Sequence, residues 1–130
     1  VFDFWQAQQV VAKKAADLIS IYPGKNGGIL KAQKICKLAG DAGIACHLGS
    51  NLEWDIGTAA MCHLAAACAN VQVNKFPPDI LGPLYYAVHP RAKAVDFKNG
   101  RVSVPQDSGL CIEMNLDEAR ELMRATQPHS

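Results

Sequence analysis

Glu53 is one of two candidate centres of chemistry in the 130 residues of this chain. It belongs to a polar loop, residues 49–55, that follows a short apolar run and reads Gly-Ser-Asn-Leu-Glu-Trp-Asp. A glutamate at such a place can hydrogen-bond a substrate, transfer a proton, or stabilise the N-terminus of the following helix. The residues alone leave these three roles open.

The second candidate is the loop at residues 22–28, which holds Gly24, Gly27 and Gly28 and also follows a short apolar run. Glycines that open a helix can cradle a phosphate with their backbone N–H groups. The glycine spacing matches neither the P-loop nor the dinucleotide-binding fingerprint. A phosphate site at Gly27 and Gly28 is therefore the weaker interpretation of this loop.

Histidine and cysteine residues give no clear metal-binding pattern. The five cysteines form no C-x-x-C pair, and we expect reduced, buried thiols in a cytoplasmic protein. A zinc site of Cys62, His63 and Cys68 would need a spacing that structural zinc sites rarely show. We expect His63 to be structural, and His47 to be a buried, hydrogen-bonded side chain rather than a general base.

Charge and hydropathy exclude two classes of partner. Lysine and arginine number 13 against 12 aspartates and glutamates, for a net charge of +1, with no basic face. Nothing in this balance favours nucleic acid or an anionic membrane surface. The most apolar segment, residues 56–71, is too short for a membrane span and contains His63 and Asn70.

The elements that position the two loops follow from the apolar pattern, which predicts helices alternating with strands. The expected elements are a helix from about residue 4 to 15 with Asp3 as N-cap, a strand at 18–22 that ends in a loop at Pro23-Gly24, a helix from Gly28 to Gly43, a strand at 44–49, and a helix at 56–69. This alternation predicts parallel βαβ units.

Two such units form half of a larger α/β protein, because a closed barrel needs about 250 residues and an open sheet would leave apolar edges unpaired. Functional side chains gather at the C-terminal ends of parallel strands. We therefore expect Tyr22 and Glu53 to end neighbouring strands and to face one shared pocket. Further along, Asn99-Gly100 predicts a hairpin, and Asn115 is the expected N-cap of a helix ending near residue 124.

An ordered series of motifs resembles one family. The series comprises Tyr-Pro-Gly-Lys-Asn-Gly-Gly-Ile at 22–29, Gly-Ser-Asn-Leu-Glu at 49–53, Ile-Gly-Thr-Ala-Ala at 56–60, Asp-Ile-Leu-Gly-Pro-Leu at 79–84, and the segments 99–105 and 108–118. Together they resemble the sixth to eighth βα region and the closing segment of muconate cycloisomerase-like enzymes. These belong to the mandelate racemase/muconate lactonizing enzyme family of the enolase superfamily.

The resemblance implies an α/β fold, the C-terminal part of a modified TIM barrel, (β/α)7β. Residues 1–105 would form the C-terminal βα units and residues 106–130 the closing segment and terminal helix. The N-terminal capping domain and the first barrel strands would lie outside this chain. It also implies a metal-dependent isomerase or lyase that removes a proton alpha to a carboxylate. Mg2+ or Mn2+ would stabilise the enediolate, on ligands upstream of Val1 and none within this chain.

Residue roles carry over position by position. Tyr22 stands where cycloisomerases and epimerases of the family have their second catalytic lysine, and Glu53 matches a glutamate that follows the seventh strand. Lys25 matches a basic residue near the glycine pair, and with Ser50 and Asn51 it is expected to bind substrate. A tyrosine can donate a proton or hydrogen-bond an oxyanion, or it can simply pack at the strand end.

The missing lysine leaves alternatives open. Tyr22 could indicate one-sided chemistry such as dehydration, or a non-catalytic barrel relative that acts as a binding or assembly module. A free-standing domain that binds a phosphorylated ligand is a third interpretation. The expected partners are a small carboxylate substrate, the rest of the same polypeptide or a complementing chain, and further copies in a homo-oligomer.

Overall fold

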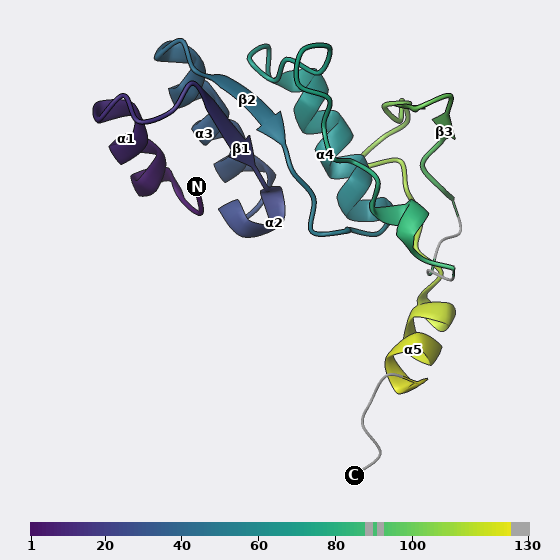
Figure 1. The fold of residues 1–130 in the computed structure, drawn as a ribbon. Helices are drawn as coiled ribbons and strands as arrows, with labels where there is room; N and C mark the ends of the chain where they lie inside the picture. The colour runs from purple at the N-terminus through teal and green to yellow at the C-terminus, as the bar shows by residue number, and fades with distance from the viewer. Residues whose placement is uncertain (88–89, 91–92, 126–130) are drawn as a thin grey trace.

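The computed structural model describes residues 1–87, 90 and 93–125, and its helices and strands alternate over the first half (Figure 1). This half contains α1 (Phe4–Ala12), β1 (Leu18–Ile21), α2 (Pro23–Asn26), α3 (Ile29–Asp41), β2 (Ala45–Leu48) and α4 (Asp55–Ala67). The second half contains a 3-10 helix, η1 (Gly82–Tyr85), a hairpin of β3 (Phe97–Lys98) and β4 (Arg101–Val102), and helix α5 (Leu116–Ala125).

Strands β1 and β2 are parallel neighbours, which confirms the predicted βαβ organisation. Leu18 pairs with Ala45 at one end and Ile21 pairs with Leu48 at the other. A further parallel bridge joins Cys46 to Val71, with the Cys46 N–H donating to the Asn70 carbonyl at 2.8 Å. The sequence analysis missed this third chain segment, because a single bridge needs no apolar run.

The core lies on one face of this small sheet. Ile19 and Ile21 of β1, with Cys46 and Leu48 of β2, are each no more than 3% exposed. They pack with the apolar stripe of α3, whose buried members recur at the three- and four-residue spacing of an amphipathic helix: Ala32, Ile35, Cys36 and Ala39. The opposite face carries the half-buried Ser20 and His47. The protein therefore buries one side of the sheet, and the other side carries both polar and apolar residues that are less buried.

The predicted loop at Pro23-Gly24 is wrong in detail, because the chain forms the one-turn helix α2 there. Proline at the first helical position has the φ angle that a helix requires and lacks an N–H that would be unpaired in any case. Gly27, with φ of 82°, then ends the turn in the left-handed conformation that glycine adopts without a Cβ penalty. The turn keeps Tyr22 to Gly27 compact beside the end of β1.

Three local predictions are confirmed. The Asp3 carboxylate accepts the Gln6 N–H at 2.8 Å and so caps α1. The Asn115 side chain accepts backbone N–H groups two and three residues ahead, at the start of α5. Asn99 and Gly100 both have positive φ, 52° and 70°, as a tight hairpin turn requires.

Helix α5 lies apart from the other helices in Figure 1, and none of its residues is buried. Within the described part of the chain, no helix combines the length and the apolar character that a membrane crossing requires. The division at residue 105 stays a prediction, and residues 126–130 of the expected terminal segment lie outside the described residues.

We expect the 130-residue chain, produced alone, to unfold without a cooperative transition. In the described sheet β1 pairs only with β2, and Phe2, Trp5 and Leu30 are 61%, 66% and 74% exposed. Unpaired strand edges and exposed apolar side chains favour association over a unique fold. Thermal melts followed by far-UV circular dichroism test this, with the full-length protein as control. One sharp transition for the isolated chain would contradict it.

Candidate functional site

The two predicted loops leave the sheet at the same edge. Tyr22 follows the last residue of β1 and Gly49 follows the last residue of β2, and these strands are parallel and in register. The Gly49 N–H extends the pairing by donating to the Ile21 carbonyl at 3.0 Å. The C-terminal ends of neighbouring strands thus place both loops together, as the sequence predicted.

Tyr22 lies directly over Gly49. A Cβ atom at Gly49 would overlap the Tyr22 ring and would lie 2.5 Å from the phenolic Oη. This distance is far below a van der Waals contact, so no residue larger than glycine fits beside the ring in its present position. The two strand ends therefore pack against each other, and Gly49 must lack a side chain because the Tyr22 ring occupies that space.

Lys25 adds a positive charge to this corner. Its Nζ atom lies 4.1 Å from the centroid of the Tyr22 ring, within the range of a cation–π contact. Lys25 is exposed and also lines a cavity of about 410 Å³ whose other walls include Phe2, Trp5 and Lys31. This cavity lies beside the predicted site, and these four wall residues are all cationic or aromatic.

Glu53 is held by its own loop. One carboxylate oxygen accepts the Ser50 Oγ–H at 2.6 Å and the Asn51 N–H at 2.9 Å, and the other accepts Asn51 Nδ2 at 3.3 Å. Ser50 and Asn51 were predicted to bind substrate, and in the structure they orient Glu53. A carboxylate with three donors has a fixed direction, which both acid–base and substrate-binding roles require.

Helix α4 and the chain after it support the Glu53 loop. The Tyr86 hydroxyl donates to the Leu52 carbonyl at 2.9 Å, and Thr58 Oγ1 donates to the Glu53 carbonyl at 3.1 Å. A Cβ at Gly82 would collide with the Glu53 backbone, so η1 begins in direct contact with the loop. The sequence analysis did not find the supporting role of Tyr86, because it acts across 34 residues.

The α2 turn and the Glu53 loop face each other. A Cβ at Gly24 would lie 3.8 Å from Asn51 Nδ2 and 3.9 Å from Glu53 Oε1, which is ordinary van der Waals distance. The structure thus brings Tyr22, Lys25 and Glu53 to one edge of the sheet. That Tyr22 and Glu53 line one shared pocket stays a prediction.

Both ring nitrogens of His47 are engaged. Nε2 lies 3.1 Å from the Pro77 carbonyl, which can only accept, so this nitrogen carries the proton. Nδ1 lies 3.2 Å from Ser20 Oγ, within hydrogen-bond distance. The predicted hydrogen-bonded role is confirmed, although His47 is half-buried rather than fully buried. Nε2 of His63 is buried without a hydrogen-bond partner among the described residues.

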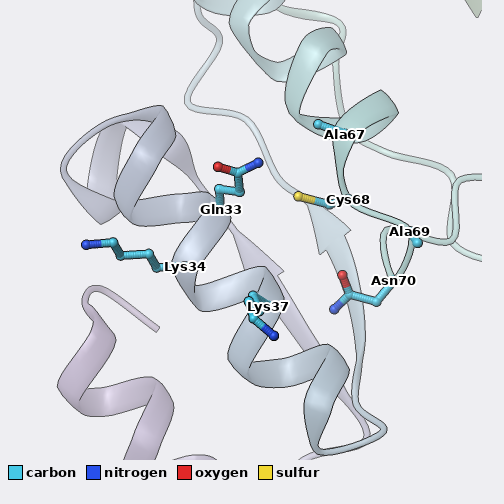
Figure 2. Close-up of a pocket in the computed structure, with 7 residues that line it drawn as sticks. All are labelled: Gln33, Lys34, Lys37, Ala67, Cys68, Ala69 and Asn70. Carbon is cyan, nitrogen blue, oxygen red and sulfur yellow. The ribbon is translucent and has the colours of Figure 1, made fainter.

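Cys36, Cys46 and Cys68 lie close together, and the described cysteines are free and buried. A cavity of about 360 Å³ is lined by Gln33, Lys34 and Lys37 of α3 on one side and by Ala67, Cys68, Ala69 and Asn70 on the other (Figure 2). The Asn70 amide donates to Cys46 Sγ at 3.1 Å.

Hydrogen bonds change the pKa values of two of these thiols. The pKa of Cys46 is lowered by a hydrogen bond from the Cys36 thiol and also by the one from Asn70, although burial acts in the opposite direction. The same contact with Cys46, together with burial, raises the pKa of Cys36.

No group of three or more histidine, cysteine, aspartate or glutamate side chains able to hold a metal ion occurs in residues 1–87, 90 and 93–125.

Comparison with known proteins matches residues 1–119 to the family model described as enolase C-terminal domain-like. Muconate cycloisomerase 1 of Rhodococcus opacus is 34% identical over 91% of this chain and 31% of its own length. L-Ala-D/L-Glu epimerase of Bacillus subtilis is 34% identical over 86% of this chain and 30% of its own length. The crystal structure of N-succinyl Arg/Lys racemase from Bacillus cereus superposes with a TM-score of 0.84 at 27% identity, covering 94% of this chain and 31% of that one.

The chain spans about a third of the length of the relatives that it matches. The predicted fold, the enolase C-terminal-domain-like part of a modified barrel, is confirmed by the family match and by the structural superposition. The paired strands β1 and β2 therefore belong to the barrel wall, with α3 and α4 on its outside.

We expect Gly49→Ala to destabilise the full-length protein by about 1–3 kcal/mol, because the new methyl group overlaps the Tyr22 ring. In a Tyr22→Ala background the same change should cost less than about 0.5 kcal/mol, since the overlapping ring is gone. Denaturant unfolding of the four proteins measures the coupling.

Gly24→Ala is the matched control, because a Cβ at Gly24 meets only ordinary contacts at the same edge. An equal cost of Gly49→Ala with and without the Tyr22 ring would show that the two strand ends are not packed as described.

Proposed function

The chain belongs to the enolase C-terminal domain-like family, and on that premise we propose that it is the C-terminal part of a metal-dependent isomerase or lyase. The reaction class that we propose is abstraction of a proton alpha to a carboxylate, as in a muconate cycloisomerase-like enzyme. Support comes from relatives named as muconate cycloisomerases and as epimerases of amino-acid derivatives.

The observation that carries the proposal is the convergence of Tyr22, Lys25 and Glu53 at one edge of the sheet. Glu53 is oriented by three donors, and Tyr22 presents a phenol beside a cation. These are the groups that move protons and bind anions in enzyme sites. A convergence of this kind on the C-terminal edge is typical of active sites in parallel α/β barrels.

We assign a role to each residue. The Lys25 ammonium would attract the substrate carboxylate, and the Glu53 carboxylate would hydrogen-bond the substrate or transfer a proton. The Tyr22 hydroxyl would donate a proton to, or hydrogen-bond, the oxygen on which negative charge develops. Because a tyrosine stands where the family resemblance implies a lysine, we favour one-base chemistry, such as dehydration, over two-base epimerisation.

Enolase superfamily enzymes generally use Mg2+, and we propose Mg2+ or Mn2+ for the full-length protein. A divalent cation would supply charge stabilisation at the substrate carboxylate. Its ligands would come from outside the described residues, which offer no group for it. A small carboxylate substrate, a homo-oligomeric state and a cytoplasmic location complete the proposal.

Full-length protein with Mg2+ is expected to exchange the alpha proton of its carboxylate substrate with deuterium from solvent, and EDTA should abolish the exchange. The reason is that an alpha proton is too weakly acidic for a side-chain base without electrophilic stabilisation of the charge. Proton NMR in D2O follows the exchange over a panel of carboxylates. Exchange that persists after complete chelation would overturn metal dependence.

Tyr22→Phe and Glu53→Gln should each lower kcat about 10²-fold or more, the range usual for loss of a proton-transfer group. Tyr85→Phe and Glu118→Gln are the matched controls, since both side chains are exposed and neither is placed in the site. Steady-state kinetics of the full-length variants provide the measurement. Unchanged turnover in both site variants would favour the alternative, a non-catalytic barrel relative that binds or assembles.

A further inference from the structure

Asn26 is the most completely buried polar residue of the α2 turn, with 3% of its surface exposed. Its Oδ1 accepts the Tyr22 N–H at 2.9 Å. Its Nδ2 donates to the Val1 carbonyl at 3.0 Å and to the Phe2 carbonyl at 3.2 Å. One amide thus joins the strand end that carries Tyr22 to a chain segment more than 20 residues earlier.

This arrangement satisfies the Tyr22 backbone without the Tyr22 side chain. Tyr22 is the N-cap of α2 but makes no side-chain capping bond. An N-cap usually uses its own side chain to satisfy the N–H groups of the first turn. Here the Tyr22 carbonyl accepts the N–H groups of Lys25 and Asn26, both at 2.8 Å, and the Tyr22 N–H is satisfied by the Asn26 side chain. The phenol ring is therefore available to lie over Gly49.

We propose that Asn26 is a positioning residue that sets the location of the Tyr22 hydroxyl relative to the chain around Val1. The inference rests on the proposed function, because Asn26 would affect turnover only through the role proposed for Tyr22. Asn26 lies behind the Tyr22 backbone and is assigned no contact with substrate.

Only a side-chain amide fits this place. The three bonds require one acceptor and two N–H donors on a short planar group, and asparagine supplies both. An ionised aspartate could accept from Tyr22 but would turn an oxygen toward the Val1 and Phe2 carbonyls. A leucine of similar size would leave the Tyr22 N–H and both carbonyls unpaired, which is costly for buried groups.

The test uses Asn26→Asp in the full-length protein. Facing two carbonyls in a buried place, the introduced carboxyl should have a raised pKa. Once protonated, it again offers one donor and one acceptor. We therefore expect kcat at pH 8 to fall about 10–10²-fold, the loss that a misplaced group produces, with KM within about threefold. The deficit should shrink as pH falls and the carboxyl gains its proton.

Asn70→Asp is the matched control. Asn70 is also an amide that donates to buried backbone, at 2.8 Å to the Cys36 carbonyl, but it lies at the thiol cavity and outside the site. We expect it to lower the melting temperature and to leave kcat within about twofold. If Asn70→Asp lost as much kcat as Asn26→Asp, the role of Asn26 would be only structural. The same conclusion would follow if Asn26→Asp kept the wild-type kcat at pH 8.

A second readout separates this inference from the proposed function. With 3-fluorotyrosine incorporated, the Tyr22 resonance is identified by its loss in Tyr22→Phe, and its shift is recorded by fluorine NMR. At pH 8, Asn26→Asp should move this resonance from its position in the otherwise unchanged protein, and Asn70→Asp should not. A moving resonance in a protein whose turnover does not depend on Tyr22 would sustain the positioning role and overturn the function. An unmoved resonance would overturn the positioning role.

Discussion

The parallel, in-register pairing of β1 with β2 is the constraint on which the candidate site depends. Ile21 pairs with Leu48, so the next residues, Tyr22 and Gly49, leave the sheet at the same level. Side chains alternate along each strand, and Ile21 and Leu48 are buried against the helices. Tyr22 and Gly49 therefore both belong to the opposite face, where the ring of one fills the space that a side chain of the other would need. A shift of one residue would separate the pair and expose the core.

Polar contacts on this face serve to orient other polar groups. Ser50 and Asn51 bind the Glu53 carboxylate, Ser20 binds His47, and Asn26 binds the backbone of Tyr22. Each contact satisfies a donor or acceptor that would otherwise be costly near a protein interior. Several polar residues that the sequence suggests as ligand-binding groups therefore bind other groups of the protein. Fewer polar groups are left to contact a ligand.

Much of this could be predicted from the sequence, because the signals are local. The apolar runs before Tyr22 and Gly49 predict both strands, and Asp3, Asn99-Gly100 and Asn115 act through neighbours within three residues. Contacts that span long stretches of sequence carry no such signal. Asn26 reaches Val1, and the bridge of Cys46 to Val71 consists of one pair. The small helix α2 was missed because its four residues, Pro-Gly-Lys-Asn, are typical of a turn and are too few to show a helical apolar period.

Tyr22 stands where the family resemblance implies a lysine, and it is better understood together with its neighbours than alone. A phenol is wider than a lysine stem, and the chain accommodates it with a glycine on the adjacent strand. The positive charge that a lysine would have brought to this place is present one helical turn later, where Lys25 Nζ lies 4.1 Å from the ring. The ring lies beside a cation. A positive charge near a phenol hydroxyl helps to stabilise negative charge that develops on a bound ligand. The corner thus keeps both a proton-bearing group and a cation, on two residues of one compact turn whose Tyr22 N–H is bound by Asn26.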